Sequence, residues 1–130
     1  MRKIRVLHFY KTSILESHGG VEKFIDSLCN GTSELDIEST VFALSRKKYN
    51  KKFKNGRYLI FNAKEDIFIF STGFSINAFF YFNNFVKEAD IIHYHFPNPF
   101  ADILHLICRI KKPFLVTYHS DIVKQKRLFH

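Results

Sequence analysis

Short apolar runs alternate along the chain with segments whose apolar residues recur at helical spacing. Residues 3–9 form the first apolar run and predict a buried strand. In residues 21–28, the apolar positions recur at i, i+3, i+4 and i+7, which predicts one buried face of a helix. Residues 38–44 combine apolar and β-branched side chains and predict a second strand, and residues 58–61 predict a further short one.

The middle of the chain is less regular. Residues 46–57 contain several Lys and Arg but no acid, and we interpret them as a basic loop. Residues 67–86 carry no charge, which raises the alternative of a membrane span, but their Ser, Thr, Gly and Asn content argues against it. The preferred interpretation is a strand over residues 67–70, a break at Ser71-Thr72-Gly73, and a Phe-rich helix over about residues 75–87.

The last third of the chain returns to regular alternation. Residues 89–96 predict a buried strand that ends at the turn Pro97-Asn98-Pro99. Asn98 can cap the following helix, because Pro99 suits the first helical position. The predicted core face of that helix consists of Phe100, Ile103, Leu104 and Ile107. Residues 114–118 predict a core strand, after which Asp121 can cap a helix that begins at Ile122.

Strands that alternate with helices predict parallel βαβ units. The expected fold class is therefore α/β, with a doubly wound, mostly parallel, Rossmann-like sheet formed by a single domain over residues 1–130. Such sheets bind ligands beyond the carboxyl ends of their strands. Three polar clusters fall at such ends, and they are His18-Gly19-Gly20, Pro97-Asn98-Pro99 and His119-Ser120-Asp121.

Charge and cysteine content narrow the classes of partner. The formal net charge of +8 favours an anionic partner, such as a nucleotide phosphate, an anionic lipid or a nucleic acid. No aromatic-basic motif supports nucleic acid, so we expect no nucleic-acid partner. Two cysteines, Cys29 and Cys108, are too few for a disulfide framework and indicate free thiols in a reducing, cytoplasmic compartment.

Gly19 and Gly20 are candidates for a phosphate-binding turn, because glycine admits close approach to backbone N–H groups at a helix N-terminus. An ordinary tight turn is the alternative, since the dinucleotide pattern G-x-G-x-x-G is absent. His119 can hydrogen-bond a ligand, or it can satisfy local backbone groups. His93 and His95 share one face of a strand, but without acidic or cysteine partners at fitting spacing they predict no metal site.

Three segments together resemble the amino-terminal domain of a GT-B glycosyltransferase of family 4. They are the strand and loop that lead to Gly19-Gly20-Val21-Glu22-Lys23-Phe24, the run from Ala89 to Pro99, and the run from Pro113 to Asp121. The resemblance covers most of the chain and is weak between about Arg46 and Phe74. It implies transfer of a sugar, with retention, from a nucleotide-sugar co-substrate to a saccharide or lipid-linked acceptor, without any other cofactor.

The resemblance also assigns site residues. Gly19 and Gly20 correspond to the loop that approaches the donor diphosphate and sugar, and His119 corresponds to the catalytic-site histidine that contacts the donor sugar. His95, Asn98 and Asp121 are candidates for the acceptor side of the cleft, with helix capping as the alternative for Asn98 and Asp121.

Family members also contain a carboxy-terminal donor-binding domain with basic residues and paired glutamates. None of it occurs in these residues, so we expect the isolated chain to be inactive unless a separately encoded domain completes it. A non-catalytic remnant or interaction module is the alternative. The basic loop, together with the Phe-rich helix, suggests peripheral attachment to an anionic surface at the inner face of the plasma membrane, for which a solvated loop is the alternative.

Overall fold

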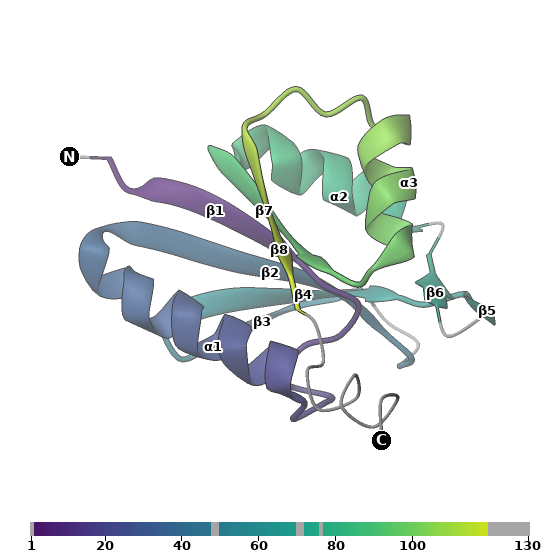
Figure 1. Cartoon of the computed structure of the whole chain (residues 1–130), viewed down its shortest axis with the longest axis horizontal. Helices are drawn as coiled ribbons and strands as arrows, with labels where there is room; N and C mark the ends of the chain where they lie inside the picture. The colour runs from purple at the N-terminus through teal and green to yellow at the C-terminus, as the bar shows by residue number, and fades with distance from the viewer. Residues whose placement is uncertain (1, 48–49, 70–71, 76, 120–130) are drawn as a thin grey trace, which may run out of the picture.

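A six-stranded sheet with helices on both faces forms the body of the molecule (Figure 1). The computed structural model describes residues 2–47, 50–69, 72–75 and 77–119. The strand order is β3-β4-β2-β1-β7-β8, and every neighbouring pair is parallel except β3 with β4. The strands are β1 Ile4–Phe9, β2 Ile37–Ser45, β3 Lys51–Asn55, β4 Tyr58–Lys64, β7 Ile91–Phe96 and β8 Phe114–Tyr118. The predicted α/β class with a mostly parallel sheet is confirmed.

Helix α1, Gly20–Thr32, covers one face of the sheet, and α2, Asn77–Glu88, and α3, Pro99–Ile107, cover the other (Figure 1). Each face has its own apolar core, because side chains alternate between the two faces of a strand. The core on the α2 and α3 face is built around fully buried phenylalanines, which explains much of the Phe-rich composition. These are Phe9, Phe42, Phe82 and Phe100.

The structure corrects the sequence interpretation of residues 51–55. They form strand β3, antiparallel to β4, whereas we predicted a loop. The turn between these strands consists of Gly56 and Arg57, and Gly56 has φ of +63°, a left-handed conformation that glycine adopts without strain. The lysines of β3 obscured its strand character, and charge is a common feature of edge strands because it discourages pairing with other chains.

Two further boundaries differ from the expectation. Helix α1 extends beyond the predicted residues 21–28 to Thr32 and leads into the 3₁₀ helix Ser33–Leu35, after which Asp36 takes the left-handed φ of 59°. The predicted break at residues 71–73 contains part of strand β6, Thr72–Phe74, which pairs with β5, Ile67–Ile69. Among the described residues, none of the helices combines the length and apolar character that crossing a membrane requires.

The carboxyl-terminal elements are less buried than the pattern predicted. Of the expected core face of α3, Phe100 and Leu104 are buried, but Ile103 and Ile107 are 38% and 59% exposed. Strand β8, predicted as a core strand, lies at the edge of the sheet and is largely exposed. Asp121, and the helix predicted to begin at Ile122, lie outside the described residues.

Candidate functional site

The candidate site lies where β1, β7 and β8 end side by side. Parallel strands place their carboxyl ends at one edge, so the segments that follow them approach one another. The backbone N–H of His119, just beyond β8, donates to the carbonyl oxygen of Phe96 at 2.9 Å. The ring of Phe24, one turn into α1 from Gly20, packs edge-on to the ring of His119 with centroids 5.1 Å apart. The amino-terminal part of α1 and His119 therefore share one edge of the sheet.

Gly19 is the N-cap of α1 and Gly20 its first residue. No side chain caps the helix, and a Cβ placed on Gly20 would meet nothing within 4 Å. A Cβ on Gly19 would lie 3.1 Å from both carboxylate oxygens of Glu22, which is itself buried. The open approach to the helix N-terminus is therefore over Gly20, because Glu22 already places negative charge beside Gly19.

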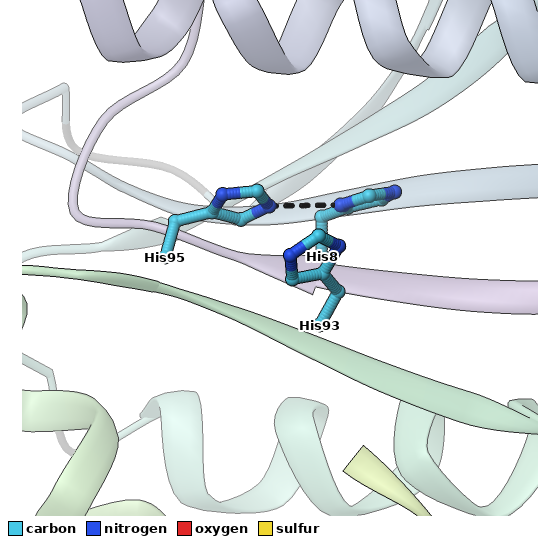
Figure 2. A group of neighbouring side chains, drawn as sticks. All are labelled: His8, His93 and His95. Carbon is cyan, nitrogen blue, oxygen red and sulfur yellow. Dashed lines mark hydrogen bonds between the residues drawn. The ribbon is translucent and has the colours of Figure 1, made fainter. Parts of the chain in front are cut away.

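Buried histidines lie beneath this edge, on the face that α1 covers. Nδ1 of His8 lies 3.0 Å from Nε2 of His95, and Nδ1 of His95 lies 2.9 Å from Nε2 of His119. His93 stacks on His95 with ring centroids 4.1 Å apart, and its Nε2 lies 2.6 Å from Oγ1 of Thr117. Figure 2 shows His8, His93 and His95 together, with the hydrogen bond between His8 and His95 dashed.

Sequence reasoning identified His93, His95 and His119 but missed His8. The pairing of β1 with β7 sets His8 directly opposite His93, and the alternation of strand side chains then places His95 on the same face. The signal available in the sequence was the buried character of both strands. Only their adjacency, which β1 and β7 acquire across 81 intervening residues, turns three separate histidines into one cluster.

Burial keeps these imidazoles neutral. Desolvation, with a smaller contribution from His93, lowers the pKa of His8 to about 3. Desolvation and the neighbouring histidines lower the pKa of His95 to about 2. Desolvation also lowers the pKa of His93 and of His119. At neutral pH the cluster therefore offers hydrogen-bond donors and acceptors rather than charge.

The acceptor-side candidates occupy different depths. His95 is 0% exposed and lies beneath His119, so it does not line the surface of this chain. Asn98 is the N-cap residue of α3, but its side chain makes no capping hydrogen bond, and its Nδ2 is buried without a partner. The predicted side-chain cap is therefore wrong, while Pro99 does occupy the first turn of α3 as expected. Whether any of these residues contacts a substrate stays a prediction.

Ring orientation decides how the histidine cluster can be used. One ring nitrogen from each of His8, His93 and His95 lies within 4.8 Å of the others, which is close enough to consider a metal ion. However, a ring nitrogen binds a metal in the plane of its ring, and His93 and His95 are stacked at an interplanar angle of 25°. Stacked rings direct their lone pairs along parallel planes rather than toward one point. The arrangement favours hydrogen bonding over chelation.

Comparison with known proteins identifies relatives that match almost the whole chain. The chain is 41% identical over 125 residues to a D-rhamnosyltransferase of Pseudomonas aeruginosa. The alignment covers 96% of this chain and 33% of that protein. It is 42% identical over 125 residues to the O-antigen chain mannosyltransferase C of Escherichia coli, covering 96% of this chain and 34% of that protein. The chain thus spans about a third of the length of these relatives.

The fold has a relative among solved structures. Sucrose-phosphate synthase from Thermosynechococcus elongatus matches with a TM-score of 0.59 and 14% identity, over 95% of this chain and 35% of that one. The model of Glycosyltransferase Family 4 matches residues 18–130. That match begins at the residue before the glycine pair and continues through β7, which carries His95, and past His119, so the chain belongs to glycosyltransferase family 4.

Proposed function

We propose that this chain is the acceptor-side part of a retaining glycosyltransferase. The enzyme would move a sugar from a nucleotide-sugar to a saccharide or lipid-linked acceptor during the assembly of a cell-surface polysaccharide. The observation that carries the proposal is the position of His119, whose neutral ring lies at the carboxyl ends of the strands, against α1 and close to an uncapped helix N-terminus. The names of the two relatives, a rhamnosyltransferase and a mannosyltransferase, support sugar transfer.

Each residue would contribute through binding rather than through covalent chemistry. The N–H groups of the first turn of α1, reached over Gly20, would stabilise the donor diphosphate, because a helix N-terminus carries partial positive charge. The neutral ring of His119 would hydrogen-bond the donor sugar and hold it in the reactive orientation. Positive charge that develops on an oxocarbenium-like sugar would be stabilised by the departing diphosphate, which stays bound in the site. We propose no metal and no cofactor besides the nucleotide-sugar.

A chimaera tests the function. The matching third of the Pseudomonas aeruginosa D-rhamnosyltransferase is replaced by this chain, which supplies the acceptor side, while the recipient supplies the rest. We expect sugar transfer from a nucleotide-sugar, and we expect His119→Asn in the chimaera to lower kcat at least tenfold, because Asn cannot reproduce the imidazole geometry. The isolated chain should neither transfer sugar nor hydrolyse the nucleotide-sugar. A chimaera that folds but does not turn over would favour the alternative, a non-catalytic remnant or interaction module.

The proposed location is cytoplasmic, at the inner face of the plasma membrane. Strand β3 presents exposed Lys51, Lys52 and Lys54 along the sheet edge. The Nζ of Lys52 lies 5.6 Å from the ring centroid of Phe85 in α2, so the basic edge and α2 adjoin. Phe80 of the same helix is 71% exposed. Basic and aromatic side chains on one surface suit an anionic lipid headgroup region, where a lipid-linked acceptor would be found.

A further inference from the structure

Three histidines form a continuous line of ring-to-ring hydrogen bonds, which we name the histidine chain. It runs from His8 through His95 to His119, with nitrogen distances of 3.0 Å and 2.9 Å. His8 and His95 are 2% and 0% exposed, whereas His119 is half-buried at the edge of the sheet. Among the described residues, none is hydrogen-bonded to Nδ1 of His119, which leaves that atom free to meet a ligand.

Proton counting restricts the tautomeric states of the histidine chain. A neutral imidazole has one N–H and one bare nitrogen, and each hydrogen bond needs one of each. If Nδ1 of His8 carries its proton, Nε2 of His95 must accept, so Nδ1 of His95 donates and Nε2 of His119 accepts. If Nε2 of His119 donates instead, the same reasoning puts the proton on Nε2 in all three residues. Only these two states satisfy both hydrogen bonds.

We propose that His8 and His95 are positioning residues that set the tautomer of His119. In one state of the histidine chain Nδ1 of His119 is a donor, suited to a phosphate or carbonyl oxygen. In the other state it is an acceptor, suited to a sugar hydroxyl. The assignment of a sugar-nucleotide as the ligand rests on the proposed function, whereas the coupling of the three tautomers rests on the hydrogen bonds alone.

The surroundings hold the rings so that this coupling persists. His93 stacks on His95, and Phe24 packs against His119, which restrains rotation of both rings. The rings of His8 and His95 are inclined by 24°, and so are those of His95 and His119. Neighbouring rings in the histidine chain are therefore close to parallel. An unpaired donor in this buried setting would lose a hydrogen bond that water cannot replace, which penalises mixed states. His93 does not belong to the histidine chain, because its Nε2 contacts Thr117.

Nitrogen NMR of the 130-residue chain, labelled with ¹⁵N, reports the tautomer of each histidine directly. At pH 7.5 we expect His8, His95 and His119 to show the same fraction of the Nδ1–H form, whatever that fraction is. Unequal fractions, or a charged ring among the three, would overturn the proposal. The measurement requires no substrate, so it can fail while the proposed function stands, and it can succeed if the proposed function fails.

Substitutions test whether the coupling passes through His95. We expect His8→Gln to change the tautomer fraction of His119, although Gln at position 8 would not contact that ring. The same His8→Gln change should leave His119 unaffected when His95→Phe is already present, because the connecting nitrogens are gone. His93→Phe, which keeps a ring in the stack, is the matched control and should preserve equal fractions in the histidine chain. An unchanged His119 in His8→Gln would overturn the proposal, as would a change in the nitrogen chemical shifts of His8 and His95 on adding equimolar Zn²⁺, which would indicate chelation.

Discussion

At the scale of single residues, the site depends on side chains that burial has made unusual. His8, His93 and His95 are buried next to one another, with no carboxylate among the partners that the structure gives them. A charged imidazole in this setting would be both desolvated and repelled by its neighbours, so the folded state holds the rings neutral. The unfolded chain carries no such restriction, and this difference links stability to pH.

Acid should therefore destabilise the chain before its carboxylates are protonated. The pKa of His8 falls from 6.5 to about 3 on folding, so between these values the unfolded state binds more protons than the folded state. Stability is complete above pH 6.5 and decreases as the pH falls, with a limiting slope of about 1.4 kcal/mol per pH unit for each such histidine. Urea unfolding from pH 7.5 to pH 4.5 measures this slope. We expect the slope for His8→Gln to be smaller than that of the parent chain by about one histidine's contribution.

Gly20 can be separated from its structural role by comparison with a second glycine. Neither Gly20 nor Gly31 has an atom within 4 Å of an added Cβ, and both lie in α1. Gly20→Ala and Gly31→Ala should each leave the fold intact and stabilise it by up to about 1 kcal/mol in thermal or urea unfolding. In the chimaera, only Gly20→Ala should raise the KM for the nucleotide-sugar, several-fold, because a methyl group would obstruct the approach to the helix N-terminus. Equal KM values for the two variants would remove Gly20 from the donor site.

At the scale of elements, β3 and α2 create a surface that neither has alone. The lysines of β3 lie on the sheet edge that antiparallel pairing with β4 brings beside α2. Phe85 of α2 then contacts the basic strip through Lys52, and the same helix exposes Phe80. The proposed attraction to an anionic membrane therefore rests on this pair of elements.

Vesicle binding tests that property. We expect the chain to bind vesicles that contain anionic phospholipid at low salt, to ignore neutral vesicles, and to dissociate as salt is raised, because screening shortens the reach of the lysine charges. Each lysine near an anionic surface contributes about 1 kcal/mol. The double variant Lys51→Gln/Lys54→Gln should therefore bind at least tenfold more weakly in a sedimentation assay. Lys3→Gln/Lys23→Gln removes the same charge elsewhere and should bind like the parent, so equal losses in both double variants would contradict a local surface.

At the scale of the whole molecule, β8 and α3 expose an apolar surface. Phe114, Leu115, Val116 and Tyr118 are each at least 51% exposed, and Leu106 of α3 is 75% exposed. A hollow of about 230 Å³ lies between β7, β8 and α3. In the relatives the matching region is about a third of the protein, and an edge of this kind suits further elements of a larger sheet.

The isolated chain should show this surface in solution. We expect it to bind an apolar fluorescent dye and to self-associate as its concentration rises, because a patch of this kind is seldom left uncovered. Leu106→Gln should reduce both signals, while changing the free energy of unfolding by no more than about 0.5 kcal/mol. Leu35→Gln removes a side chain of matched type that is 71% exposed in the 3₁₀ helix after α1 and should change neither signal. Undiminished dye binding in Leu106→Gln would place the apolar surface elsewhere.

The sequence by itself determined the elements that strong local patterns specify. Residues 3–9, 38–44 and 89–96 were predicted as strands from their apolar runs, and α1 from its helical spacing, because burial on a regular backbone imposes its period on the sequence. The same logic failed at β3, where a lysine-rich edge strand has no buried face to mark it. It also failed at Ile103 and Ile107, whose helical spacing does not reveal that the described structure leaves both side chains partly exposed. Gly19, Gly20 and His119 were chosen as candidates because they follow predicted strands at the end where parallel sheets bind ligands.

Only the tertiary structure decided how the histidines are used. The sequence showed His93 and His95 on one face of a strand, but it could not show that β1 lies beside β7 and brings His8 to within hydrogen-bonding distance of His95. The sequence argued against a metal site on His93 and His95 from the lack of acidic or cysteine partners, but it could not show the angles between the rings, which favour a hydrogen-bonded line. Local patterns record how much surface each residue buries, whereas the partners of a buried polar group are set by which strands become neighbours, and that is a property of the folded sheet as a whole.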